Sequence, residues 1–304
     1  NAMNSNPTQR PFPIPLVDMF GPGSQPEDEE LEYMPMPRGM ATYQPPQLPE
    51  PEELAGHGGA VRVLTELLHT LQAAIRGEAV PPVWLAGLTA EELQLVNQVL
   101  GEGEVSAQVT AAPGACAAGE VAAPAQAQVQ EAVFAGVWRV LDGLADGTLQ
   151  DRIEVGAIPE VLKREARQDA LSGFQPDPTP PAGVMNAPTL LQELHDQRQQ
   201  WRPGLPAHLV NLSLLPLSPQ DMAFMEQQMG AGRVLILSRG YGNCRISSTR
   251  VANTWRVVYY NSQDAMILNS IEVVDMPEVA CAAQEDLVDS EKRLREVLEW
   301  VNQV

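Results

Sequence analysis

The chain repeats itself, and this duplication constrains its fold more than any other feature of the sequence. Leu88–Leu93 opens a segment that ends at Gly101, and 129 residues later Leu217–Met222 opens a segment that ends at Gly230. Three further matches recur at offsets of 117 and 118 residues: Trp138-Arg139-Val140 with Trp255-Arg256-Val257, Ile153-Glu154-Val155 with Ile271-Glu272-Val273, and Pro159-Glu160-Val161 with Pro277-Glu278-Val279. Because these matches follow one another in the same order, we interpret the body of the chain as two copies of one unit.

Two proline-rich stretches divide the chain further. Residues 1–57 are predicted to form an acidic, Pro-rich extended arm, since residues 1–56 hold 12 of the 27 prolines and nine acidic residues against two basic ones. We expect the natural start at Met3, with Asn1 and Ala2 as a cloning remnant. The first repeat then covers residues 58–170, a Pro-rich linker covers 171–186, and the second repeat covers 187–304. The first copy carries about a dozen extra residues in the Ala-, Gly- and Pro-rich segment 111–127.

Each repeat is predicted to run helix, helix, strand, strand, strand, helix. Thr89 and Ser218 are typical helix N-caps, each followed by an acid at the third helical position, and a glycine ends each helix. In the second repeat, residues 233–238, 254–260 and 266–274 are predicted strands, and a long final helix is predicted to start at Pro277. The predicted fold class is therefore α+β, an internal duplication of two related helix/antiparallel-sheet units, each with its own sheet, preceded by the Pro-rich extended arm.

Charge excludes several classes of function. The chain has 19 Lys and Arg against 39 Asp and Glu, a formal net charge of −20. Such a chain repels phosphate, so we expect neither nucleic acid nor an anionic membrane as a partner, and instead a basic peptide or protein face. The sequence contains no run of 18 apolar residues, so no direct membrane insertion is expected. The polar start lacks a secretory signal pattern, and the three cysteines are far apart, which favours a reducing cytoplasmic compartment.

The acidic arm has two interpretations. It is either a solvated tail or a segment that docks on a partner or on the body through its apolar and acidic side chains. On the second interpretation the candidate partner-binding residues are Phe12, Ile14, Glu27, Asp28, Glu29 and Glu30.

Few residues suggest catalysis. Cys244 is the strongest candidate, because adjacent glycines and the flanking Arg239 and Arg245 could lower the pKa of a thiol and make it reactive. Alternatively, Cys244 is a small residue at the start of a strand. Cys281 is predicted to pack within the final helix, and Cys116 is predicted to be a bystander thiol in the insertion.

The other recurring polar residues have simple structural interpretations. His69 and His195 occupy matching positions and are interpreted as structural helix residues, since none of the four histidines has metal-ligand spacing. Glu154 and Glu272 recur on equivalent strands, either as paired carboxylates or, more simply, as a solvated face. Trp138 and Trp255 are predicted to anchor the core of each repeat. The sequence therefore predicts no catalytic residue, cofactor or metal site, which favours a binding protein.

Several segments resemble the HupH/HyaF family of hydrogenase expression proteins. The resemblance lies in Gly242–Thr249, Ala252–Val257, Tyr260–Asp264 and Ile271–Ala283, and in the amino-terminal Gly21–Gln25 and Tyr33–Pro37. It implies an accessory protein in maturation of the membrane-bound uptake [NiFe] hydrogenase, acting as a chaperone of the iron–sulfur small subunit before export by the twin-arginine route. The resemblance brings no catalytic residues.

The implied partner is the hydrogenase small subunit precursor with its cationic twin-arginine signal, which the charge of this chain would attract. Two alternatives stay open. One is a thiol-dependent redox or cluster-assembly factor that works through Cys244. The other is a scaffold joining other maturation proteins, for example a thioredoxin-like one.

Overall fold

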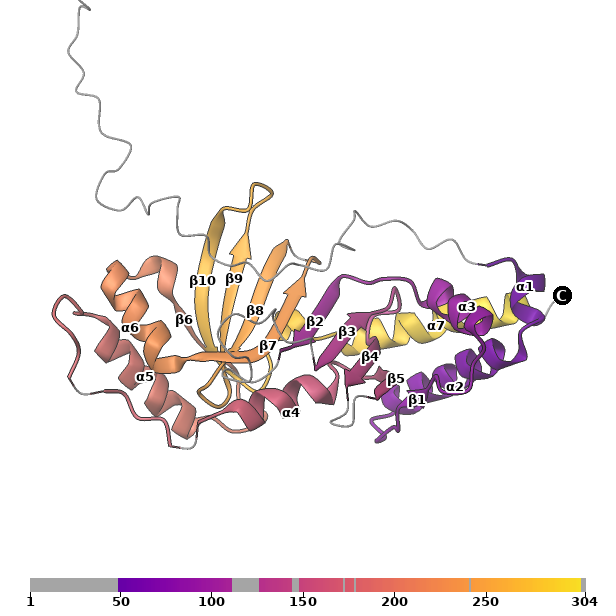
Figure 1. Cartoon of the computed structure of the whole chain (residues 1–304), viewed down its shortest axis with the longest axis horizontal. Coiled ribbons are helices and arrows are strands. Elements are labelled where there is room, and N and C mark those ends of the chain that lie inside the picture. The colour runs from indigo at the N-terminus through magenta and orange to yellow at the C-terminus, as the bar shows by residue number, and fades with distance from the viewer. Residues whose placement is uncertain are drawn as a thin grey trace, which may run out of the picture. The chain divides into compact units, whose positions relative to one another are not determined.

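Ten strands form one continuous antiparallel sheet in the computed structural model (Figure 1), which describes residues 49–110, 126–143, 148–171, 173–177, 179–240 and 242–301. In spatial order the strands are β1 (Val83–Trp84), β5 (Leu149–Val155), β4 (Val137–Gly143), β3 (Ala127–Glu131), β2 (Val105–Val109), β7 (Ala231–Ser238), β8 (Asn243–Thr249), β9 (Thr254–Tyr260), β10 (Met266–Val273) and β6 (His208–Asn211). The helices are α1 (Pro51–Ala55), α2 (Gly58–Ile75), α3 (Ala90–Leu100), α4 (Glu160–Asp169), α5 (Ala187–Gln200), α6 (Pro219–Met229) and α7 (Gln284–Val301), with single 3-10 turns η1 (Leu212–Leu214) and η2 (Glu278–Ala280).

The sheet confirms the α+β class and corrects the prediction of one sheet per repeat. The first repeat supplies β1–β5 and the second supplies β6–β10, and the two halves join through the antiparallel pair β2–β7, in which Ala107 lies opposite Ile236. Each of these strands would otherwise be an exposed sheet edge, so pairing them satisfies both rows of backbone donors and acceptors. Residues 1–48 of the predicted arm lie outside the described residues, and its end is not extended as predicted. Residues Pro51–Ala55 form helix α1, which a proline at its first position can start, and Leu54 is 1% exposed in the apolar cluster with α2.

Each repeat also contains strands that the sequence did not predict. A short edge strand lies between the first two helices of each repeat, and it pairs antiparallel with the last strand: Val83 opposite Ile153 and Val210 opposite Ile271. These edge strands have two and four residues, too few to show the alternation of a strand. The predicted order of three strands leaves out β8, although a strand near Cys244 is one of the two interpretations of that residue, and Cys244 and Ile246 alternate with polar positions as in a strand with one buried face.

The predicted helix caps are present and bind two helices at once. Thr89 and Glu92 form a capping box at α3, and Glu92 Oε1 also accepts the Gly59 N–H at the start of α2, 2.7 Å away. Ser218 and Asp221 form the equivalent box at α6, and Asp221 Oδ1 accepts the Ala187 N–H at the start of α5, 3.0 Å away. The acid at the third helical position therefore fixes the first helix of each repeat against the second.

The final helix starts later than predicted. Residues after Pro277 form the turn η2, and α7 begins only at Gln284. The intervening backbone turns away because the Ala282 N–H donates to the Ala157 carbonyl of the first repeat, 2.9 Å away, and Asp286 then accepts the Ala283 N–H. Cys281 therefore lies between the two helical segments, not within the final helix.

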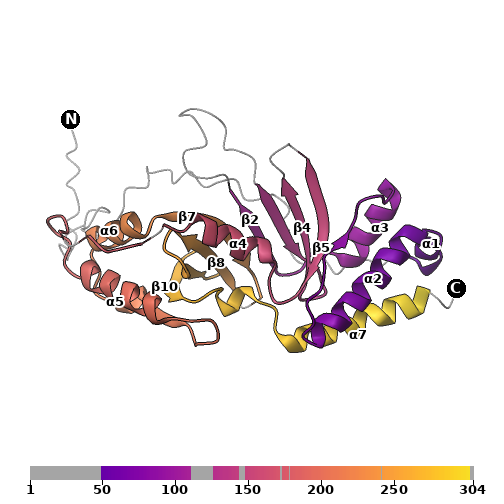
Figure 2. The ribbon, with the colours of Figure 1, turned by 90° about the horizontal axis from the view of Figure 1, so that it is seen from below.

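Helices cover the two faces of the sheet in different places (Figures 1 and 2). On one face, α2 and α3 pack on β1, β4 and β5, while α5 and α6 pack on β6 and β10. On the other face, α4 and η2 cover the middle strands, where Trp138 and Trp255 are 0% and 2% exposed, as the core-anchor prediction required. Their indole N–H groups donate to the carbonyls of Gly156 and Asp275.

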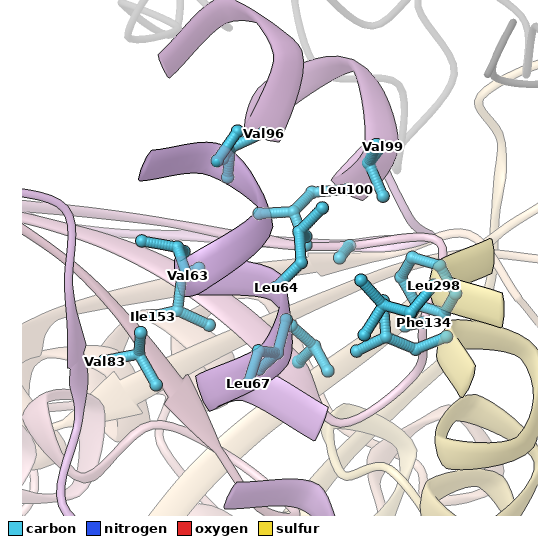
Figure 3. Packing of buried hydrophobic residues seen from close by; sticks show 14 of the residues in the cluster. Val63, Leu64, Leu67, Val83, Val96, Val99, Leu100, Phe134, Ile153 and Leu298 are labelled. Atoms are coloured by element: carbon cyan, nitrogen blue, oxygen red, sulfur yellow. The ribbon is translucent and has the colours of Figure 1, made fainter. Parts of the chain in front are cut away.

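The last helix of each repeat packs on the other repeat. Glu165 on α4 pairs with Arg233 on β7 at 3.0 Å, whereas α7 lies along α2, where Glu291 accepts a hydrogen bond from Gln72 at 2.8 Å. Leu298 of α7 joins the apolar cluster formed by α2, α3 and the first-repeat strands (Figure 3). The two repeats are thus held together by exchanged helices as well as by the shared sheet. Among the described helices, none combines the length and the hydropathy required to cross a bilayer.

Candidate functional site

Among the described residues, no helix covers the middle of the sheet on the face opposite α4. Strand alternation and register place eight side chains on this face, and none of them is buried. We call this surface the central floor. Its residues are Ser106 and Gln108 on β2, Gln128 and Gln130 on β3, Leu235 and Leu237 on β7, and Arg245 and Ser247 on β8. The helix pairs α2/α3 and α5/α6 stop short of these four strands, because their apolar clusters draw sheet residues only from the outer strands. The floor is therefore a half-exposed surface between two helical layers.

The floor obeys the internal two-fold relation of the repeats. Across β2 and β7, Ser106 lies opposite Leu237 and Gln108 lies opposite Leu235. At the offset of 129 residues that relates the repeats, Ser106 corresponds to Leu235 and Gln108 to Leu237. Exchanging the repeats therefore turns the pair Ser106–Leu237 into the pair Leu235–Gln108, and the register stays the same. On the next strands, at an offset of 117 residues, Gln128 corresponds to Arg245 and Gln130 to Ser247. The duplication thus makes one symmetric backbone surface with two different sets of side chains.

Equivalent arginines border the floor on both sides. Arg139 on β4 forms a two-pronged pair with Asp151, at 3.0 and 2.6 Å, and donates to Asn97 on α3. On the other side, Arg256 on β9 corresponds to Arg139, pairs with Glu226 on α6, and donates to Asn269 at 3.1 Å. These contacts fix the helices that form the walls, since each arginine holds a wall helix to the sheet.

Arg245 differs from the two bordering arginines. In the described part of the chain, no carboxylate lies within ion-pair distance of the Arg245 guanidinium, which is half-exposed on the floor. Its cross-strand neighbours are Leu237 and Val258, both apolar. In a chain of net charge −20, the uncompensated charge on the floor is thus positive.

The thiol of Cys244 lies on the face opposite the floor. Cys244 is 3% exposed beneath the α4 layer, and burial raises the pKa of its thiol to about 11, although the Tyr259 hydroxyl hydrogen-bonds to it. The expectation of a lowered pKa is therefore wrong, because adjacent strand residues point to opposite faces and the guanidinium of Arg245 points away. The alternative, a small residue near the start of a strand, is confirmed by the start of β8 at Asn243.

The remaining predicted site residues are not brought together. Burial likewise raises the pKa of Cys281 to about 11, and Cys116 lies outside the described residues, as do Phe12, Ile14, Glu27, Asp28, Glu29 and Glu30. Glu154 pairs with Arg152 on β5, whereas Glu272 lies on β10, so the sheet order separates these carboxylates by most of its width. Within the described residues, no group of three His, Cys, Asp or Glu could hold a metal ion.

Sequence reasoning missed the floor itself. Its residues are ordinary polar and aliphatic ones, and the available signal was the combination of offset and alternation: positions equivalent at 129 and 117 residues fall on one face of four strands. That signal could be interpreted only once β2 and β7 were known to be neighbours.

Comparison with known proteins agrees with the duplication. The model of the HupH hydrogenase expression protein C-terminal conserved region matches twice, at residues 58–174 and 184–301. The chain is similar over 96% of its length to hydrogenase expression/formation protein HoxQ of Cupriavidus necator, at 54% identity and covering 99% of that protein. It is also similar to the hydrogenase-1 operon protein HyaF of Escherichia coli, at 32% identity over 93% of this chain and 95% of that protein.

A solved structure, the hydrogenase expression protein HupH from Thiobacillus denitrificans, matches 36% of this chain and 92% of its own, with 26% identity and a TM-score of 0.34. The two matches of the family model cover both repeats, and the relatives are matched over nearly their whole length. The chain belongs to the HupH family of hydrogenase expression proteins.

Proposed function

We propose that this chain is a non-enzymatic accessory protein in maturation of the membrane-bound uptake [NiFe] hydrogenase, and that it holds the iron–sulfur small subunit precursor in the cytoplasm before twin-arginine export. The observation that carries the proposal is full-length similarity to proteins named for hydrogenase expression and formation. An open sheet face between two helical walls supports a role in holding a protein segment.

The charge of the chain supports the choice of partner. A net charge of −20 attracts a cationic segment such as a twin-arginine signal and speeds the encounter. This attraction is long-range and screened by salt, so the rate of association should fall as ionic strength rises.

Co-purification tests the proposal. The tagged chain is used to capture the small subunit precursor, with and without its signal peptide, from cells that make the hydrogenase. Capture that requires the signal indicates a chaperone that delays export, and capture without the signal indicates binding of the subunit body. If neither form is captured at any salt concentration, the proposed partner is wrong.

The thiol-dependent alternative has its own test. The raised pKa of Cys244 leaves almost no thiolate at neutral pH, which disfavours nucleophilic or redox work by this residue. We expect a Cys244→Ser variant to support full hydrogenase activity in cells. A variant that folds normally but fails to support activity would restore the thiol hypothesis.

A further inference from the structure

The central floor has the features of a docking surface with a definite occupant. Its four strands lie between β4 and β9, and at the usual strand spacing of about 4.8 Å these two strands are about 24 Å apart. An α-helix with its side chains is about 10–12 Å in diameter, so one helix fits between the walls.

The backbone of the floor favours a helix as the bound segment. Strands β3, β2, β7 and β8 each have a neighbour on both sides, so their ladder donors and acceptors are already used. An extended peptide laid over the floor would find no backbone partners, and its own N–H and C=O groups would lose water without compensation. A helix satisfies these groups internally and presents only side chains to the floor.

The side chains of the floor indicate which side chains the bound helix should carry. Leu235 and Leu237 lie next to each other in the middle of the surface, half-exposed, and offer apolar contacts to a helix stripe. Glutamines and serines surround them, and Arg245 supplies a guanidinium that has no carboxylate partner in the described residues. A carboxylate on the incoming helix would complete this pair in a partly desolvated place, where a charge-assisted hydrogen bond is stronger than on an open surface.

We infer that the central floor binds an amphipathic helix of the partner protein, with its apolar stripe on Leu235 and Leu237 and an acidic side chain on Arg245. The surface is argued from the fold alone; the identity of the partner, the small subunit precursor, rests on the proposed function. The floor therefore takes a segment of the folded or folding subunit body, because the cationic twin-arginine signal has the wrong charge for Arg245. Two attractions thus act on different parts of one partner. The net negative charge of the chain attracts the cationic signal, and the central floor binds a helix of the subunit body.

Charge reversal on the full chain tests the inference independently of the partner. Two synthetic 18-residue amphipathic peptides share one leucine stripe, and the flanking positions carry Glu in one peptide and Lys in the other. Binding is measured by fluorescence anisotropy at 0.15–0.3 M salt, where long-range attraction is largely screened. We expect Arg245→Glu to weaken the Glu peptide about tenfold and to strengthen the Lys peptide.

Lys292→Glu is the matched control, since it makes the same change in net charge at an exposed position of α7. Leu237→Ser tests the apolar part, and Leu149→Ser, at a leucine that is 75% exposed on β5, is its control. Circular dichroism and thermal unfolding check that each variant folds. If Arg245→Glu and Lys292→Glu change both peptides equally, only net charge matters and the inference is wrong.

Capture of the precursor body then separates this inference from the proposed function. We expect the wild-type chain and Lys292→Glu to capture the precursor without its signal, and Arg245→Glu and Leu237→Ser to lose that capture. If all four chains capture it equally, the proposed function stands and the floor is not the site. If none captures it, the proposed partner is wrong, and the peptide measurements still decide the floor.

Discussion

Glu131 is a buried acid whose ionisation should set the pH dependence of stability. It ends strand β3 with a side chain 6% exposed, and its Oε1 accepts the Gly136 N–H at 3.3 Å. Burial raises the pKa of this carboxyl from 4.5 to about 7. Backbone hydrogen bonds from Gly136 and Val105 lower this pKa without outweighing burial, and the nearby carboxylates of Glu104 and Asp286 raise it by smaller amounts. The folded protein therefore holds Glu131 as a neutral acid over a pH range in which the unfolded chain ionises it.

Linkage between ionisation and folding gives the sign and the size of the effect of Glu131 on stability. Because the folded pKa lies above the unfolded one, the stability due to the neutral acid is complete below pH 4.5 and is lost as pH rises through about 7. At 1.36 kcal/mol per pKa unit, the largest possible loss of stability from this shift is about 3.4 kcal/mol. Glu131→Gln keeps the acceptor oxygen and cannot ionise, so relative to wild type it should stabilise the protein by about 3 kcal/mol at pH 8.5 and by less than about 1 kcal/mol at pH 5.

Urea unfolding at pH 5.0 to 8.5, followed by tryptophan fluorescence, measures the free energy of unfolding of both proteins. The difference between variant and wild type removes the general repulsion of a chain with net charge −20. Glu102→Gln, at an exposed position next to Gly103, removes the same charge and should leave the pH dependence unchanged. A difference between Glu131→Gln and wild type that is the same at every pH would refute the reasoning.

Three further perturbations test the duplicated framework. Asp221→Asn should destabilise the protein by about 2–4 kcal/mol at pH 7, because the carboxylate accepts backbone N–H groups from two helix starts. These hydrogen bonds outweigh burial and hold the pKa of Asp221 well below its usual range. The difference in the free energy of unfolding between wild type and variant should therefore shrink as pH falls below 3.8. Leu294→Ala on α7 should cost about 2–5 kcal/mol, measured by urea unfolding, since this side chain is 0% exposed in the first-repeat cluster; a cost below 1 kcal/mol would contradict the helix exchange. Trp138→Phe and Trp255→Phe should each cost about 1–2 kcal/mol by loss of the indole hydrogen bond, and additive effects in the double variant would confirm that the two anchors act independently.

Local signals in the sequence predicted local structure well. The capping boxes at Thr89 and Ser218 depend on residues three positions apart, and both are present in the structure. The tryptophans were assigned to the core because each repeats at an equivalent apolar strand position, and both are buried.

Contacts between the repeats could not be predicted in this way. The pairing of Ala107 with Ile236 joins residues that are 129 positions apart in the sequence. The alternating pattern of a strand is the same whether the strand lies at the edge of a sheet or pairs with a strand of the other repeat, so the pattern does not reveal this contact. The apolar stripe of α7 could in the same way cover its own repeat or the other. The error at Cys244 was different in kind: a strand from Asn243 places Cys244 and Arg245 on opposite faces, so sequence proximity to arginine did not mean spatial proximity.

The open floor follows from how the duplicated helices are used. Each repeat has two long helices before its four-stranded meander, and these cover its own outer strands together with the short edge strand. Its last helix goes to the other repeat: α4 covers the middle of the sheet on one face, and α7 lies against α2 at the edge. Joining the repeats through β2 and β7 thus creates a wide centre with two faces, and the described helices cover one of these faces. A sheet with one face on the core and the other solvated is stable when the solvated face is polar, as the glutamines and serines of the floor are. The departures from that pattern are Leu235, Leu237 and Arg245, which has no carboxylate partner among the described residues. They lie together beside the two-fold axis, where a partner helix can cover them.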